Sequence, residues 1–215
     1  MKLLFIGNSH TYYNAMPQMV QELFAAVGQK VHITMLAAGG KNLSYHITSQ
    51  NVAFNVRYGG YDFVIAQEKA GGFEPLSFRD SAKILKDMCE SAGAAFYLYM
   101  PWTARDDRAG QRDMTDAYQR FCCENGCFFA PVGEVFSKML TNPAAADKLY
   151  RDDNKHAALF GSYAAALTVF YTVTGRKRIM KVSEIADPGV RLGFPEELCQ
   201  MAHAEACRTM RLFNG

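Results

Sequence analysis

The sequence predicts an α/β fold in which helices cover both faces of a parallel β-sheet. Short apolar runs typical of buried strands alternate with longer amphipathic segments typical of helices. Parallel neighbours need long crossover connections, and helices of this length supply them. No linker, internal repeat or low-complexity tract divides the 215 residues. We therefore expect three layers, α/β/α, in one domain spanning residues 1–215.

Five segments are expected to form the strands of this sheet. The first is the run Leu-Leu-Phe-Ile, which leads directly into a Gly-Asn-Ser turn. The fourth ends at Pro101, which cannot donate to a strand ladder. The expected strands are residues 2–6, 31–36, 62–67, 94–100 and 127–132.

Helices are expected between the strands and after the last of them. The clearest begins near Met16, has Pro17 in its first turn and ends before Gly28, with apolar residues at three- and four-residue steps. The span 176–193 has no clear pattern and receives no assignment. The expected helices are residues 16–27, 44–56, 76–92, 107–124, 159–174 and 195–213.

Charge and hydropathy exclude several classes of function. The 23 basic and 21 acidic residues give a net charge of +2 without a long basic run, so we expect no nucleic-acid partner. The apolar stretch at the N-terminus is too short for a signal peptide. The most apolar segment, 157–173, is interrupted by Gly161, Ser162 and Thr168, which argues against a membrane span. A cytoplasmic protein without membrane association is expected.

The six cysteines are expected to be reduced thiols on apolar faces, since no secretory signal accompanies them. Cys123 and Cys127 have the spacing of half a zinc site. No second Cys/His pair lies nearby in the sequence to complete a tetrahedron. We therefore predict no structural metal.

Ser9 is the first candidate for chemistry, because ligands of parallel α/β sheets bind beyond the carboxyl ends of the strands. It lies in Gly-Asn-Ser-His-Thr, directly after the first expected strand. A turn there presents the hydroxyl, and the N–H groups of a following helix favour a developing oxyanion. The alternative is a plain turn or helix-capping serine.

Asp153 and His156 are the second candidate, in the segment Asp-Asn-Lys-His. A serine hydroxyl needs an imidazole to take its proton and usually a carboxylate to orient that imidazole. An aspartate three residues before the histidine can fold back to do this. Asp152 is a rival for the carboxylate role, and an incidental histidine in a charged loop is the alternative.

Two further strand ends carry candidate donors to a substrate carbonyl. Gly39 and Gly40 follow the second strand, where glycine permits close backbone approach. Gln67 ends the third strand, and its amide is suited to the same oxygen. Ordinary turn glycines and a polar strand cap are the alternatives. Glu68 beside it is a candidate substrate contact.

The order of these features resembles the SGNH hydrolases, a flavodoxin-like superfamily of esterases and lipases related to the GDSL enzymes. Bacterial members that begin Phe-Ile-Gly-Asn-Ser-x-Thr-Tyr-Tyr are the most similar, and this chain reads Phe-Ile-Gly-Asn-Ser-His-Thr-Tyr-Tyr from Phe5 to Tyr13. Similar stretches occur at 61–68, 130–134 and 149–156. The resemblance covers roughly residues 2–175 and implies a five-stranded sheet with strand order 2-1-3-4-5.

The resemblance also implies the roles of individual residues. Ser9 would attack the acyl carbon, His156 would act as general base and then acid, and Asp153 would orient His156. The backbone N–H groups of Ser9 and of Gly40 or Gly39 would hold the oxyanion. Most of the superfamily adds an asparagine in a Gly-x-Asn-Asp motif, where this chain has Gln67 and Glu68.

Other aromatic residues are candidate substrate contacts. Trp102 follows the fourth strand, and Tyr12, Tyr13 and Arg105 are expected near the same cleft; aromatic and arginine side chains suit a sugar or another polar substrate. His10 either lines the acyl pocket or is a buried spacer. His32, His46 and His203 are treated as structural or surface residues.

The sequence thus predicts a cofactor-independent esterase acting on a small-molecule ester, with a short acyl group such as acetyl on a carbohydrate or metabolite. Acyl transfer by the same residues is the first alternative. The second is a non-catalytic module that binds an anionic ligand at the Gly-Asn-Ser loop. Neither Gly-x-Gly-x-x-Gly nor Gly-Lys-Ser/Thr occurs to support that module.

Overall fold

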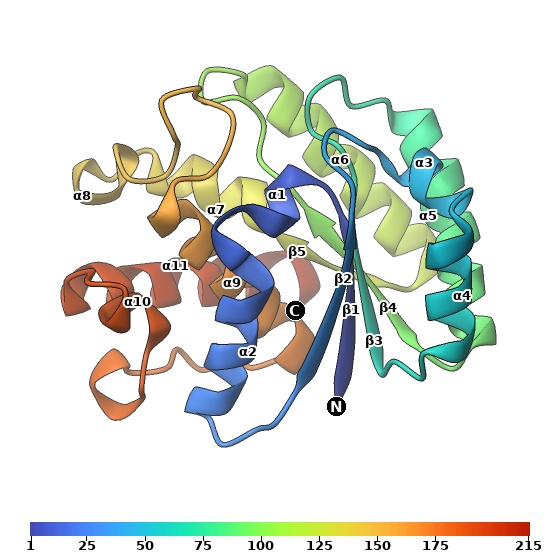
Figure 1. Cartoon of the computed structure of the whole chain (residues 1–215). Helices are drawn as coiled ribbons and strands as arrows, with labels where there is room; N and C mark the ends of the chain where they lie inside the picture. The colour runs from blue at the N-terminus through green and yellow to red at the C-terminus, as the bar shows by residue number, and fades with distance from the viewer.

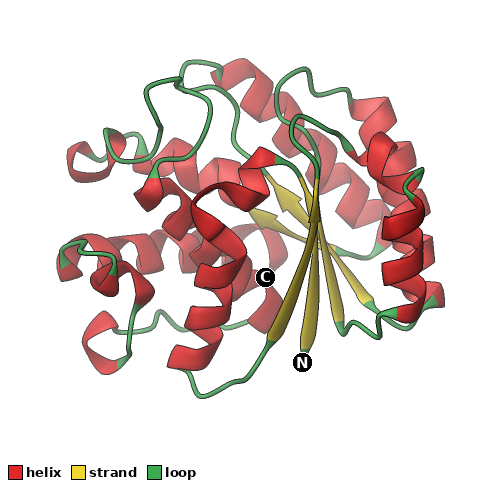
Figure 2. Cartoon of the chain, viewed as in Figure 1, coloured by secondary structure: helices red, strands yellow, loops and turns green.

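The computed structural model describes residues 1–215, which form one parallel β-sheet covered by helices (Figure 2). The sheet has five strands in the order β2-β1-β3-β4-β5. The fold class and the strand order expected from the sequence are both confirmed. Each strand lies within two residues of its expected position. The strands are β1 (Lys2–Gly7), β2 (His32–Ala37), β3 (Phe63–Gln67), β4 (Ala95–Met100) and β5 (Phe128–Pro131).

Helices form a layer on each side of the sheet (Figure 1). Successive side chains of β1 point to opposite faces of the sheet. Leu3 and Phe5 pack in the apolar core on one face, and Leu4 and Ile6 pack in the core on the other. The first layer holds α2 (Met16–Ala26), α7 (Val132–Met139), α9 (Leu159–Thr174) and α11 (Glu196–Asn214). The second holds α3 (Leu43–Ile47), α4 (Gln50–Tyr58), α5 (Pro75–Ser91) and α6 (Arg108–Asn125).

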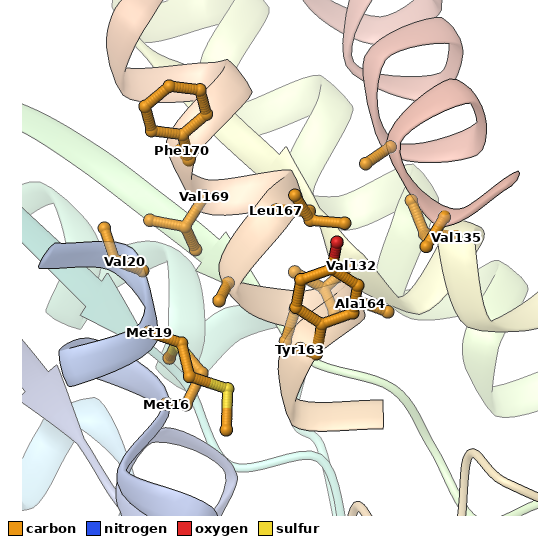
Figure 3. Packing of buried hydrophobic residues seen from close by; sticks show 14 of the residues in the cluster. Met16, Met19, Val20, Val132, Val135, Tyr163, Ala164, Leu167, Val169 and Phe170 are labelled. Atoms are coloured by element: carbon orange, nitrogen blue, oxygen red, sulfur yellow. The ribbon is translucent and has the colours of Figure 1, made fainter. Parts of the chain in front are cut away.

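Helix α9 is the central helix of the first layer. Every residue from Phe160 to Val173 is buried, because α2, α7 and α11 surround the helix and the sheet lies beneath it. Figure 3 shows Val20 of α2 next to Val169 of α9, and Met16 and Met19 belong to the same apolar core. The most apolar stretch of the sequence is therefore a buried core helix, and none of the helices has the length and hydropathy of a membrane span.

Several helix boundaries differ from those expected. The predicted helix over 44–56 is two helices, because Ser49 caps the second by accepting from the Val52 N–H. The fifth strand stops at Pro131 since Val132 already begins α7, a helix that was not predicted. The other short helices outside the predictions are α1 (Ser9–Tyr12), η1 (Tyr13–Ala15), α8 (Pro143–Ala146), η2 (Val182–Glu184) and α10 (Pro188–Arg191).

The register of the sheet aligns the strand ends that carry the candidate residues. Ile6 lies opposite Ala66, so the next residues of β1 and β3, Gly7 and Gln67, end side by side. Gly7 also pairs with Ala37 at the end of β2. The loops after β1, β2 and β3 therefore leave the same edge of the sheet.

Candidate active site

Ser9 is the first residue of α1, immediately beyond the end of β1. Asn8 caps this short helix: its side-chain oxygen accepts from the His10 N–H at 3.0 Å, and its amide nitrogen donates to the Lys41 carbonyl at 2.8 Å. Asn8 thus joins the turn after β1 to the loop after β2. Ser9 remains 8% exposed, so its hydroxyl is held at the surface of a cavity rather than in the core.

Gln67 supports this turn from behind. Its Oε1 accepts from the Asn8 N–H at 3.0 Å and from the Thr11 hydroxyl at 2.9 Å, while its Nε2 donates to the Glu68 carbonyl. Only a glycine fits at position 7, because a Cβ there would lie 2.6 Å from Gln67 Oε1. The amide expected to face the substrate is fully buried and bound to the protein on both sides, so the structure gives Gln67 a positioning role instead.

Glu68 also differs from its expected role as a substrate contact. Its carboxylate accepts from the Leu43 N–H at 3.1 Å and from the Lys69 N–H at 2.5 Å. Only 4% of the residue is exposed, and burial raises the pKa of the carboxyl. The side chain ties the end of β3 to the start of α3 and does not line the cavity beside Ser9.

Replacing Gln67 by Ala separates the two roles considered for it. The change leaves the buried Asn8 N–H without its acceptor, which costs about 1–3 kcal/mol, so we expect the melting temperature and kcat to fall together. Thermal unfolding and steady-state ester hydrolysis measure the two effects. A loss of kcat at unchanged melting temperature would instead indicate an amide that acts on the substrate.

His156 joins Ser9 to Asp153 across 147 positions of sequence. Its Nε2 lies 3.0 Å from Ser9 Oγ, and its Nδ1 lies 2.6 Å from Asp153 Oδ2. The other carboxylate oxygen accepts from the backbone N–H groups of Lys155 and His156, both at 2.9 Å. The hydrogen bond with the His156 ring, with these backbone bonds, holds the pKa of Asp153 well below its ordinary value.

This series of hydroxyl, imidazole and carboxylate is the arrangement that makes a serine nucleophilic. The structure brings together all three residues named from the sequence as catalytic. Asp152, the rival carboxylate, is exposed and makes no hydrogen bond or ion pair.

The loop that carries Asp153 and His156 is held on several sides. It is closed at its base by a bridge between Tyr150 and Ala157. Trp102 Nε1 donates to the Lys155 carbonyl at 2.8 Å, and the Arg105 N–H donates to the Asn154 carbonyl at 2.9 Å. These bonds fix the imidazole opposite Ser9 without any regular secondary structure in the loop itself.

Asn14 provides a further anchor for this loop, which explains a break that the sequence analysis missed. Asn14 and Ala15 adopt left-handed backbone conformations, with φ of 54° and 52°, so α1 and α2 are separate helices. The break directs the Asn14 amide to the Ala157 carbonyl at 3.1 Å and to Ser162 Oγ at 2.8 Å. Asparagine tolerates this backbone region better than most residues, which is the only signal the sequence offered.

A cavity of about 260 Å³ opens beside Ser9 and His156. Gly40 lines it with φ of 68°, and the space where a Cβ would stand is empty. The N–H groups of Ser9 and Gly40 have no acceptor within the chain. Gly39 lies against the Tyr12 hydroxyl and does not line the cavity. Of the two glycines, Gly40 is therefore the one whose N–H could donate to a substrate carbonyl in the cavity.

His10 and Trp102 form an aromatic wall of the cavity. Their ring centroids are 4.6 Å apart, and His10 lies 5.7 Å from the His156 ring. Burial, and secondarily the charge of His156, lowers the pKa of His10 to about 4, so the ring is neutral at pH 7. Trp102 is 1% exposed and stacks on Phe136 at 4.2 Å. Both residues line the cavity, as a substrate contact would, and their role as substrate contacts stays a prediction.

Two lysines were not predicted as part of this site. Lys69 and Lys155 both line the cavity. Lys69 directly follows Glu68 and Lys155 directly precedes His156, both of which the sequence analysis singled out, but a loop lysine carries no pattern of its own. No group of three or more His, Cys, Asp or Glu side chains is placed to hold a metal ion.

Comparisons with known proteins agree with the fold. No protein-family model matches the sequence, and no curated protein matches it. Among solved structures, a DUF4886 family protein from Bacteroides uniformis superposes with a TM-score of 0.75 at 19% identity, covering 98% of this chain and 95% of that one. A lipase/acylhydrolase from Enterococcus faecalis gives a TM-score of 0.65 at 14% identity, covering 81% and 96%. A family 3 carbohydrate esterase from Clostridium thermocellum gives 0.66 at 10% identity, also covering 81% and 96%.

The chain has the fold of the SGNH hydrolases. Of the four sequence features whose order resembles this superfamily, the Gly-Asn-Ser turn, the Gly-Gly loop and the Asp-x-x-His segment meet at the cavity, through Ser9, Gly40 and His156. The remaining feature, the amide at the end of β3, departs from the SGNH pattern, because the Gln67 side chain binds the turn that carries Ser9 instead of facing the cavity.

Proposed function

We propose that the protein is a serine esterase that cleaves a short acyl group, such as acetyl, from a carbohydrate or small metabolite. The hydrogen-bonded series from Ser9 through His156 to Asp153, opening on a cavity with free N–H donors, is the observation that carries this proposal. The SGNH fold supports it at the level of hydrolases.

The mechanism follows from the contacts. Ser9 Oγ attacks the acyl carbon while His156 Nε2 takes its proton, and Asp153 stabilises the imidazolium that forms. The N–H groups of Ser9 and Gly40 receive the oxyanion. His156 then protonates the leaving alcohol, giving an acyl-serine. A water molecule, deprotonated by the same imidazole, releases the acid and restores Ser9.

The size and lining of the cavity support a short acyl group and a polar remainder. The cavity volume of about 260 Å³ is smaller than the volume of roughly 300–1,000 Å³ that is usual for sites enclosing drug-sized ligands. Its apolar lining is limited to Ala70, Trp102 and Ala104. The carbohydrate specificity named for the Clostridium thermocellum enzyme belongs to that protein, and we extend it to this chain as the first substrate class to test.

A fluorophosphonate probe tests the proposal directly, because it reacts with an activated serine and leaves a mass label. We expect stoichiometric labelling of Ser9, located by peptide mass spectrometry, and its loss in the His156→Ala variant. Labelling of a different serine, or none in a folded protein, would contradict an esterase and favour a binding module.

A further inference from the structure

The cavity beside Ser9 carries positive charge that the mechanism above does not use. Lys69 and Lys155 both line it, and neither forms an ion pair within the chain. The carboxylates nearest in sequence are engaged elsewhere: Glu68 with backbone N–H groups and Asp153 with the His156 ring. Asp107 is the one carboxylate that lines this cavity, so the two lysines give its lining a surplus of positive charge.

A second cavity, of about 320 Å³, adjoins the first and adds to this charge. The two share the residues Thr103, Ala104 and Asp107. Three arginines line the second cavity: Arg105, Arg108 and Arg112. Arg105 pairs with Asp147 at 2.9 Å, whereas the other two form no ion pair. Both lie in the first turns of α6, where the helix dipole also favours an anion.

Two carboxylates, Asp107 and Glu134, also line the second cavity, and each already accepts a hydrogen bond from the protein. Asp107 caps α6 through the Gly110 N–H at 2.9 Å, and Glu134 accepts from the Thr115 hydroxyl at 2.6 Å. Gln111, 5% exposed, accepts from the Thr103 N–H, but its amide nitrogen is buried with no hydrogen-bond partner. Together the two cavities are lined by five Lys or Arg side chains and two carboxylates, so their lining has a surplus of positive charge.

The position of the second cavity relates it to the leaving group rather than to the acyl group. Two of its residues hold the loop that carries His156: the Arg105 N–H donates to the Asn154 carbonyl at 2.9 Å, and the Tyr150 hydroxyl donates to the Thr103 carbonyl at 3.2 Å. His156 gives its proton to the leaving oxygen, so the alcohol part of a substrate lies toward this loop.

We propose that the substrate is an acyl ester of an alcohol that carries an anionic group, a phosphate, sulfate or carboxylate. Arg108 and Arg112 bind this group in the second cavity, and the ester lies in the first cavity, which Lys69 and Lys155 line. The proposal rests on the esterase function proposed above and specifies its substrate class. The anionic group takes no part in bond making or breaking: Ser9 gains the acyl group, and the alcohol leaves with the proton from His156.

Two acetyl esters with leaving phenols of similar acidity provide the test, 4-acetoxyphenyl phosphate and the uncharged 4-methoxyphenyl acetate. We expect a higher kcat/KM for the phosphate. The ratio of kcat/KM for the phosphate to kcat/KM for the uncharged ester should fall by roughly tenfold in the Arg108→Gln/Arg112→Gln double variant, because a hydrogen bond to a charged group is lost. The same ratio should also fall at raised ionic strength, because salt screens the charges. Arg120→Gln, an exposed arginine later in α6, is the matched control and should leave the ratio unchanged.

Equal kcat/KM for the two esters in the native protein would overturn the anionic substrate, and a phosphate preference unaltered in the double variant would overturn the assigned site. Hydrolysis of neither ester would count against the esterase function instead. Calorimetric binding of phenyl phosphate to the Ser9→Ala protein then decides the present proposal separately. Binding that is weakened in the double variant supports it, and absence of binding refutes it.

Discussion

Replacing Ser9 by Ala is expected to lower kcat for a short-chain ester by roughly four to six orders of magnitude, and replacing His156 by Ala by a similar factor. Without the hydroxyl no acyl-serine forms, and without the imidazole 3.0 Å away the hydroxyl keeps its proton at neutral pH. Steady-state hydrolysis of 4-nitrophenyl acetate measures both losses.

The double variant Ser9→Ala/His156→Ala makes this prediction more specific. Residues that act as one unit give grossly non-additive losses, so the double variant should retain about the activity of either single variant. Ser91→Ala and His32→Ala, both at exposed positions away from the cavity, are matched controls that should leave kcat unchanged. Losses that add in full would mean that Ser9 and His156 do not act in a common step.

The positions of the candidate catalytic residues were easier to predict from the sequence than the contacts that support them. Ser9 follows a short apolar strand, and the carboxyl ends of parallel strands must meet at one edge, so the sequence placed it correctly. The pairing of Asp153 with His156 is local, three residues apart, and a single turn achieves it. Local geometry and sheet topology were therefore sufficient to predict where these residues lie.

The direction of a side chain at the end of a strand was not predictable in the same way. Gln67 ends β3 as expected, but whether its amide faces the cavity or the underside of the Ser9 turn depends on Asn8 and Thr11, which arrive from β1. The separation of α1 from α2 likewise depends on the contact of Asn14 with Ala157, 143 positions away. Such choices are made by tertiary contacts that periodicity does not encode.

The segment 176–193, which had no sequence assignment, is held by a buried polar network. Asp187, 3% exposed, lies 2.7 Å from His203 Nε2 and accepts from the Tyr163 hydroxyl at 2.8 Å. The Tyr171 hydroxyl lies 3.0 Å from the other ring nitrogen of His203 and accepts from the Met180 N–H. The network joins this segment to α9 and α11, and it explains why a region without hydrophobic periodicity is ordered.

Replacing Asp187 by Ala is therefore expected to cost about 3–5 kcal/mol of unfolding free energy, because it leaves the partners of a buried carboxylate without an acceptor. For a chain of this size the melting temperature should fall by about 10 °C or more. The matched control is Glu184→Ala, whose ion pair with Lys181 is exposed and should contribute less than about 1 kcal/mol. Equal melting temperatures for the two variants would contradict a stabilising network.

The pH dependence of this loss gives a second test of the same network. Burial alone would raise the pKa of Asp187, but hydrogen bonds from His203 and Tyr163 outweigh it, so the pKa lies below its ordinary value. A carboxyl whose pKa is lowered on folding stabilises the protein at neutral pH, and this contribution disappears as the pH falls through the lowered value. The difference in unfolding free energy between the native protein and Asp187→Ala should thus be constant from neutral pH down to about pH 4 and decrease below it. Urea unfolding across this range measures the difference, and a difference that does not decrease below about pH 4 would mean that Asp187 is not held as an anion.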